Sequence, residues 1–150
     1  KKSSGGGGAS GSGKSIELRE EFYCRPCDMF ECLMDEGRVR AYTGSHCSIV
    51  REAGAPFSLF NGSVTGTLVE VVTNERVVQM WRNSSWPQGT LSRVEITLTS
   101  PSEGKTVVTL KQSGIPEEDD YGNSNTVDVT YQGWRGQIFG RIRQCFGFGC

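Results

Sequence analysis

Six segments between residues 46 and 112 have the composition of short β-strands, and turn residues separate them. In the clearest of them, residues 90–99, Val94, Ile96 and Leu98 lie on one side and polar residues lie on the other. The turns include Asn61-Gly62, Thr73-Asn74 and Glu103-Gly104, of which Asn-Gly is the strongest hairpin signal. This pattern predicts an antiparallel sheet with one face buried and the other exposed to water.

The segments before this β region predict one more strand and two short helices. Residues 16–23 alternate in the same way and form the expected first strand. Pro26 suits the first turn of a helix, where its missing N–H costs nothing, so a helix is expected over residues 27–34. A second short helix is expected over residues 36–42, where Gly44 ends the run.

The last segment predicts a long amphipathic helix, preceded by a polar, acidic loop over residues 113–126. Its residues at three- and four-residue spacing are Trp134, Ile138, Arg141, Ile142 and Cys145. Gly136 and Gly140 each cost about 1 kcal/mol relative to alanine, so tertiary packing has to hold this helix. We therefore expect an α+β helix-grip fold, in which a curved antiparallel sheet wraps around a long C-terminal helix.

Length and charge limit the domain organisation and the classes of partner. The chain has 150 residues, of which 1–15 are predicted to be a flexible Gly/Ser-rich linker and 16–150 one domain. Three of the 16 basic residues lie in that linker, which leaves 13 against 17 acidic residues and a net charge of −4 for the domain. This charge argues against nucleic acid and membrane surfaces as partners, and no apolar run reaches the roughly 20 residues of a membrane helix.

Residues 8–15, GASGSGKS, fit the phosphate-binding pattern G-x-x-x-x-G-K-[ST] letter for letter. A working loop of this kind follows a buried strand and opens a helix, so that backbone N–H groups converge on phosphate. Here only Gly, Ser and Lys precede the motif, and a strand pattern follows it. The match is therefore attributed to composition, and no nucleotide cofactor is expected.

The six cysteines include a C-x-x-C pair, Cys24 and Cys27, which has zinc-knuckle and redox spacing. A zinc site needs four ligands, and adjacent His46 and Cys47 are poorly spaced to complete one. Redox chemistry of the thioredoxin type needs a parallel βαβ context, which the strand pattern does not provide. The favoured interpretation is that all six are free thiols in a reducing compartment, with Cys24 ending a strand and Cys27 and Cys32 on the short helix.

Few residues could carry catalysis. His46 is the only histidine, so any Ser/His or Cys/His scheme depends on it. The adjacent carboxylates at residues 117–120 lie in a loop, where nothing is expected to shift their pKa values usefully. We therefore expect no enzymatic activity, no catalytic residues, no metal and no cofactor.

The three tryptophans are expected in different settings. Trp81 is placed in the middle of a strand and Trp134 at the start of the last helix, so both are expected in the core. Trp86 precedes Pro87 in a loop, and two alternatives remain open for it. It either covers the open end of the sheet or is offered to a partner.

Several motifs occur in an order that resembles the carboxy-terminal domain of the activator of heat shock protein 90 ATPase. They are a V-x-G strand at residues 64–66, a strand ending in W-R at 81–82, an S-W-P-x-G loop at 85–89, G-I-P at 114–116, Q-G-W at 132–134 and F-G-F-G at 146–149. The resemblance covers residues 16–150. One departure is the segment between G-I-P and Q-G-W, residues 117–131, which is longer than is usual in the family.

The resemblance implies a START-like (SRPBCC) fold and a cytoplasmic co-chaperone that acts as a monomer. It implies that the domain engages the amino-terminal ATPase domains of heat shock protein 90 and stimulates ATP hydrolysis by favouring the closed chaperone. The full-length family protein carries a further amino-terminal domain, so this chain corresponds to an excised domain or a shorter relative. The partner-binding candidates at these motifs are Trp86, Pro87, Gln88, Gly89, Ile115, Pro116, Glu117 and Glu118.

A carrier of hydrophobic small molecules is the alternative function, because START-like folds often keep a cavity between sheet and helix. The residues expected to line such a cavity are Phe22, Phe60, Trp81, Val94, Ile96, Leu110, Trp134 and Ile138. A space of several hundred Å3 would favour a ligand, and a packed interior would favour a protein partner.

Overall fold

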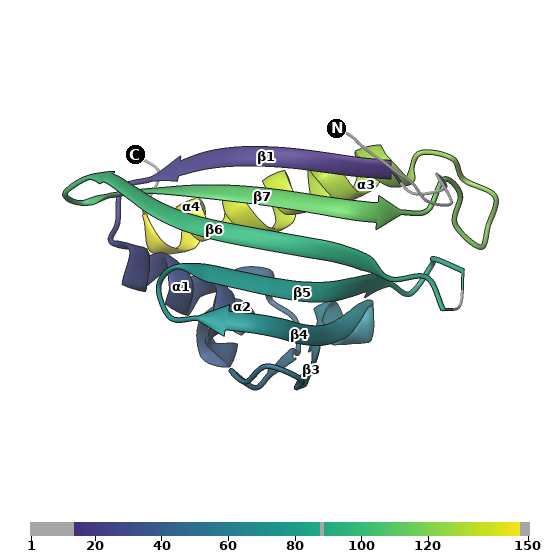
Figure 1. Ribbon diagram of the computed structural model, residues 1–150, viewed down its shortest axis with the longest axis horizontal. Helices are drawn as coiled ribbons and strands as arrows, with labels where there is room; N and C mark the ends of the chain where they lie inside the picture. The colour runs from purple at the N-terminus through teal and green to yellow at the C-terminus, as the bar shows by residue number, and fades with distance from the viewer. Residues whose placement is uncertain (1–13, 88, 148–150) are drawn as a thin grey trace.

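The computed structural model describes residues 14–87 and 89–147, and in it a seven-stranded antiparallel sheet carries all the labelled helices on one face (Figure 1). The strands are β1 (Lys14–Phe22), β2 (Ser48–Ile49), β3 (Pro56–Leu59), β4 (Val64–Val72), β5 (Arg76–Asn83), β6 (Ser92–Ser102) and β7 (Lys105–Ile115). The helical segments are α1 (Pro26–Met34), α2 (Glu36–Thr43), η2 (Phe60–Gly62), α3 (Thr126–Gln132), η3 (Gly133–Gly140) and α4 (Arg141–Phe146). The expected α+β helix-grip fold is confirmed.

The strand order is β1-β7-β6-β5-β4-β3-β2, so the first strand of the chain pairs with the last. The strands from β2 to β7 follow one another as antiparallel neighbours. The helices α1 and α2 connect β1 at one edge of the sheet to β2 at the other. At the turns predicted from sequence, Asn61, Asn74 and Gly104 have positive φ, which Asn and Gly tolerate better than most residues.

The strand β1 begins at Lys14, two residues before the expected start of the domain. Lys14 and Ser15 are the last two residues of the phosphate-loop match, and both lie in a strand that pairs with β7. Residues 8–13 of that match lie outside the described residues. In a phosphate-binding loop these two residues would open a helix, which they do not do here.

Short polar contacts set the bounds of α1 and α2. The backbone N–H of Arg25 donates to Asp28 Oδ2 at 3.1 Å, which caps the start of α1. Asp35 accepts from the backbone N–H of Arg38 at 3.0 Å and caps α2. Gly44, with φ of +70°, ends α2 at the position expected from the sequence.

The long C-terminal helix consists of α3, the π-helical segment η3 and α4, and it differs from the prediction in its start. Residues 126–132 form α3, so the polar loop ends at Asn125 and the helix begins eight residues before Trp134. Trp134, Ile138 and Ile142 are buried against the sheet as expected. Cys145 is exposed, so its place in the apolar stripe was predicted wrongly.

The π-helical segment adds a residue to the buried stripe of the long helix. In a π-helix residue i bonds to residue i+5 rather than i+4, which moves later side chains around the axis. Phe139, five residues after Trp134, is fully buried, and the two rings stack at a centroid distance of 5.8 Å. Cys145, in the last turn of α4, is exposed although it lies three residues after the buried Ile142.

The hydrophobic core lies between the inner face of the sheet and the helices. Its fully buried large side chains include Phe22, Phe30, Met29, Leu68, Ile96, Leu110, Phe139 and Ile142. A glycine bulge adjusts the end of β7, where Gly114 has φ of +83° and β1 pairs Ser15 with Ser113 but Lys14 with Ile115. The bulge turns Ile115 inward, where it is fully buried at the start of the loop to α3.

Candidate functional site

Two loops meet at one end of the sheet, and both contain partner-binding candidates from the sequence. One loop, residues 84–91, joins β5 to β6, and the other, residues 116–125, joins β7 to α3. The backbone N–H of Asp120 donates to the Ser85 carbonyl at 2.7 Å and so connects them. Figure 1 shows both loops at this end, with the β6–β7 hairpin at the opposite end.

Trp86 is turned inward, which is one of the two alternatives left open by the sequence. Its side chain is 2% exposed, and its ring lies 5.5 Å from that of Trp81 between centroids. Arg82 donates from Nη2 to the Trp86 carbonyl at 2.6 Å, and Asn83 Oδ1 accepts from Ser85 at 2.9 Å. Trp86 therefore anchors the loop on the core.

The other candidates divide between buried anchors and exposed residues. Ile115 is fully buried and Pro116 is half-buried, with its carbonyl accepting from the Thr126 hydroxyl at the start of α3. Glu117 and Glu118 are exposed, and Pro87 is half-buried. Gly89 is exposed with φ of +85°, and Gln88 lies outside the described residues.

The two loops together present an acidic surface that also carries exposed apolar side chains. We call this surface the loop face and define it by the exposed residues Gly89, Leu91, Glu117, Glu118, Asp120 and Tyr121. Leu91 is 49% and Tyr121 79% exposed. Asp119 holds the second loop in shape by accepting from the backbone N–H groups of Tyr121 and Asn123. Hydrogen bonds from Asn123 also lower the pKa of Asp119, which keeps it ionised.

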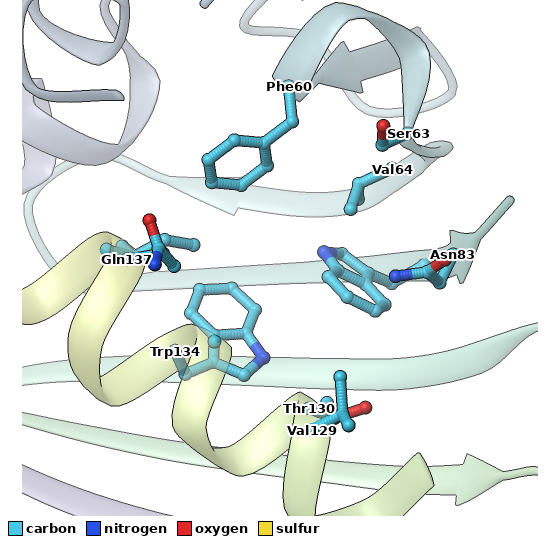
Figure 2. Close-up of a pocket in the computed structure, with 11 residues that line it drawn as sticks. Phe60, Ser63, Val64, Asn83, Val129, Thr130, Trp134 and Gln137 are labelled. Atoms are coloured by element: carbon cyan, nitrogen blue, oxygen red, sulfur yellow. The ribbon is translucent and has the colours of Figure 1, made fainter. Parts of the chain in front are cut away.

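A groove lies beside this end of the molecule, between the long helix and the β3–β4 turn. Its volume is about 250 Å3. The residues that line it are Phe60, Ser63, Val64, Trp81, Asn83, Val129, Thr130, Gly133, Trp134, Gln137 and Ile138. Figure 2 shows Phe60 on one side and Trp134 on the other, with Gln137 and Asn83 at its two ends. Four of the residues expected from sequence to line a cavity lie here: Phe60, Trp81, Trp134 and Ile138.

Deeper between sheet and helix, the space is much smaller. A cavity of about 30 Å3 has Ile96 among its lining residues, together with Trp134 and Ile138. The other three expected lining residues, Phe22, Val94 and Leu110, are fully buried in the core and line neither space. Of these two spaces, only the smaller lies in the interior, and the larger one is open at the surface.

Most of the groove residues were not predicted from the sequence, although one signal was present. Val129, Gly133 and Gln137 follow at intervals of four, as do Thr130, Trp134 and Ile138, so both rows lie along one side of a helix. The helix was expected to begin at Trp134, so its first two turns were not predicted. The opposite wall comes from residues about 50 to 75 positions earlier, which no local pattern connects to the helix.

The candidate catalytic and metal-binding residues lie in two segments of the described chain, one around α1 and one next to β2. His46 is exposed next to β2, and its backbone N–H donates to Asn61 Oδ1 at 2.9 Å. Cys24 follows β1, and Cys27 and Cys32 lie on α1, close to the expected placement. Within residues 14–87 and 89–147, no group of three or more His, Cys, Asp or Glu side chains is placed to hold a metal ion.

The cysteines in this part of the chain are free thiols, and three of them are buried. Burial raises the pKa of Cys32 to about 11 and also raises the pKa values of Cys24 and Cys47. These thiols stay protonated near neutral pH, whereas the thiolate is the nucleophile and the metal ligand. None of the helices in the described ranges is long and apolar enough to cross a membrane.

Comparisons with known proteins identify the family. Residues 24–147 match the family model described as "Activator of Hsp90 ATPase homolog 1-like protein". The "Activator of 90 kDa heat shock protein ATPase homolog" of Dictyostelium discoideum is 33% identical over 135 residues, which are 90% of this chain and 33% of that protein. The human "Activator of 90 kDa heat shock protein ATPase homolog 1" is 28% identical over 134 residues, 89% of this chain and 37% of that protein. The chain thus spans about a third of the length of these curated relatives.

A solved structure agrees with this assignment. The crystal structure of an HSP90 activator from Plasmodium falciparum superposes with a TM-score of 0.86 at 26% sequence identity. The superposition covers 89% of this chain and 96% of that one. The family match, the sequence identities and the shared fold extend over nearly the whole described domain. The chain therefore belongs to the family of Activator of Hsp90 ATPase homolog 1-like proteins.

Proposed function

We propose that this chain is a co-chaperone domain that binds heat shock protein 90 and stimulates its ATPase. The observation that carries the proposal is the close similarity, in sequence and fold together, to a protein named as an HSP90 activator. The names of the Dictyostelium and human relatives support it. The chain acts in the cytoplasm as a monomer, and it works by docking to its partner without chemistry of its own.

The physical mechanism is a shift between two states of the chaperone. A partner that binds the closed, dimerised state more tightly than the open state raises the closed population in proportion to that difference in affinity. The proposed contact is with the amino-terminal ATPase domains of the chaperone. The isolated domain binds weakly, because a second, tethered contact would normally raise its effective concentration.

The loop face is the proposed contact surface. Its acidic residues favour encounter with a basic surface on the chaperone, and Leu91 and Tyr121 supply exposed apolar area for the contact itself. Trp86 and Ile115 act as buried anchors of the two loops, and the half-buried Pro116 follows Ile115. Pro87, Gln88 and Gly89 complete the first loop in this proposal.

The test compares two charge reversals at opposite ends of the molecule. Glu118 lies on the loop face, and Glu103 lies in the β6–β7 hairpin at the other end, where it is also exposed. Glu118→Lys should weaken binding to full-length heat shock protein 90 by about three- to tenfold at low ionic strength, with a smaller effect in high salt. Glu103→Lys, with the same change of charge, should bind as the unmodified chain does.

Affinity is measured by titrating the labelled chain with the chaperone, and ATP turnover is followed in parallel. Binding should tighten with a non-hydrolysable ATP analogue that closes the chaperone, because the mechanism requires preference for that state. Equal affinity for the open and closed chaperone would reject the mechanism. Equal loss in both variants would reject the loop face as the contact surface. Trp86→Ala is unsuitable for this test, since truncating a buried tryptophan costs about 3–5 kcal/mol of stability.

A further inference from the structure

Tyr121 is the most exposed of the four tyrosines. It is 79% exposed and lies on the loop face, in the loop between β7 and α3. By contrast, Tyr42 is 6% exposed, and Tyr131 is half-buried against the core. A tyrosine hydroxyl in such an open position is accessible to enzymes that transfer a group to it.

Four acidic residues, 117–120, directly precede Tyr121 in the chain. The whole segment 112–134 contains no lysine or arginine, so no basic residue of the segment offsets their charge. Lys14 of β1 lies 3.9 Å from Glu117, but both side chains are more than half exposed, so this pair contributes little. A tyrosine with such neighbours complements an enzyme whose substrate groove is basic.

The loop around Tyr121 can open without disturbing the core. No residue from 117 to 125 is buried, and Asp119 holds the loop in shape through bonds to residues of the same loop. A bond of 2.7 Å from the Asp120 N–H to the Ser85 carbonyl connects it to the neighbouring loop. Opening therefore exposes no core side chain and costs few hydrogen bonds, so the segment can adopt the extended form in which protein kinases bind their substrates.

Tyr23 is the other exposed tyrosine, at 56%, and it also follows acidic residues, Glu20 and Glu21. Its surroundings, however, are fixed by the fold. Arg143 Nη2 donates to Glu20 Oε1 at 2.7 Å and to the Glu21 carbonyl at 2.8 Å, and Phe22 is fully buried at the end of β1. Binding of this segment to a kinase would pull Phe22 out of the core and separate β1 from β7. Tyr23 therefore provides an internal control.

We propose that Tyr121 is a phosphorylation site for a protein-tyrosine kinase with a basic peptide-binding groove. In the reaction the Tyr121 oxygen bonds to the γ-phosphorus of ATP, the bond from that phosphorus to the β-phosphate oxygen breaks, and the hydroxyl proton passes to the catalytic base of the kinase. ADP leaves, and the loop face gains about 1.5–2 negative charges at pH 7. The proposal goes beyond binding to heat shock protein 90, because the kinase acts on the free chain.

The experiment incubates the folded chain with MgATP and a tyrosine kinase that phosphorylates the copolymer of glutamate and tyrosine. The intact mass gives the number of phosphates, and fragmentation of peptides gives their positions. One phosphate per chain should form, on Tyr121. Tyr121→Phe should reduce the initial rate by at least about tenfold, whereas Tyr23→Phe should leave it unchanged. Circular dichroism checks that each variant is folded, since unfolding would expose all four tyrosines.

The role of the acidic residues is tested with two triple variants that lose the same charge. The test variant should be phosphorylated about five- to tenfold more slowly, because it loses three charge contacts to the groove, and the control variant should stay within about twofold. Asp119 is kept in both because it holds the loop in shape. The test variant carries Glu117→Gln, Glu118→Gln and Asp120→Asn, and the control carries Glu52→Gln, Glu75→Gln and Glu103→Gln at exposed positions elsewhere.

Three results would overturn the proposal or its basis. Absence of phosphate on Tyr121, while the same kinase sample modifies the copolymer, overturns the site. Modification of Tyr23 at an equal rate in the folded chain does so as well. An unchanged rate for the test variant overturns recognition through the acidic residues. No chaperone is present in the assay, so each result is independent of the proposed function in binding heat shock protein 90.

Discussion

A single polar side chain, Gln112, connects the sheet to the long helix inside the core. It is fully buried on β7, accepts from Trp134 Nε1 at 2.7 Å and donates to Ser92 Oγ at 2.7 Å. Ser92 in turn donates to the Trp81 carbonyl at 2.9 Å. Each of these bonds has normal length, and together they fix the position of Trp134 over the sheet.

Removing this connection should destabilise the protein. Gln112→Leu keeps the volume of the side chain but leaves the Trp134 indole N–H without an acceptor, so we expect the free energy of unfolding to fall by about 1–3 kcal/mol. Urea denaturation measures the change. Lys111→Met at the neighbouring exposed position is the control and should stay within about 0.5 kcal/mol. An unchanged midpoint for Gln112→Leu would show that the connection adds nothing to stability.

At the scale of elements, the π-helical segment η3 contains three glycines with different surroundings. A Cβ at Gly136 would meet no heavy atom within 4 Å, whereas a Cβ at Gly140 would lie 3.0 Å from the Arg135 carbonyl oxygen. Gly140 therefore leaves room for the Arg135 carbonyl, whereas Gly136 only adds backbone flexibility. Helix propensity alone predicts the same cost for both glycines.

Alanine substitutions separate the two roles. Gly136→Ala should raise the free energy of unfolding by up to about 1 kcal/mol, because alanine loses less backbone entropy in a helix. Gly140→Ala should gain less or lose stability, since its methyl group crowds the Arg135 carbonyl. Thermal and urea unfolding of both variants provide the comparison. Equal gains would mean that the close approach at Gly140 imposes no restraint.

The elements that the sequence predicted well are those with a clear local period. The strand β6 alternates in burial as expected, and Pro26, Asp35 and Gly44 mark helix ends through local chemistry. The first turns of the long helix were missed because Thr126, Val127, Val129 and Thr130 are β-branched and disfavour a helix on their own. Packing of Thr126 and Thr130 against the rest of the molecule overrides that preference.

The candidate sites were less predictable, because they depend on contacts between distant residues. The S-W-P-x-G and G-I-P motifs located both loops, but only the fold brings Ser85 and Asp120 together. The sequence could not decide between the two alternatives for Trp86, since the answer depends on the ring of Trp81 beneath it. For the same reason, the groove joins Phe60 and Val129 without any local signal.

At the scale of the whole molecule, arginine–carboxylate pairs connect segments on its surface. Arg51 forms two hydrogen bonds to Glu31 at 2.6 and 2.7 Å, and Arg93 and Arg76 both contact Glu95. Hydrogen bonds from Arg51 lower the pKa of Glu31, and those from Arg93 lower the pKa of Glu95. In each case folding favours the ionised carboxylate.

The lowered pKa values of Glu31 and Glu95 determine the direction in which stability changes with pH. A carboxylate whose pKa is lowered on folding contributes stability above its ordinary value of 4.5, and that stability is lost as the pH falls through the folded value. The free energy of unfolding should therefore decrease on acidification below about pH 4.5, and Glu31→Gln should make the decrease shallower. The effect at neutral pH should stay within about 1 kcal/mol, since both side chains of the pair are more than a third exposed.

The matched control for this prediction is Glu52→Gln, because the side chain of Glu52 makes no ion pair with any described residue. Urea unfolding at a series of pH values measures both variants. The pH profile of Glu52→Gln should follow that of the unmodified chain. If Glu31→Gln gives the same profile as well, the pair with Arg51 does not contribute to acid sensitivity.

The position of β1 next to β7 has a consequence for synthesis on the ribosome. Within this domain, β1 is synthesised about 90 residues before its neighbour β7, and Glu20 meets Arg143 only after the C-terminal helix has been made. Until then the apolar side chains of β1 are not packed in the native core. The growing chain can therefore aggregate with other unfolded chains. The domain should therefore remain prone to aggregation until its C-terminal helix has been synthesised.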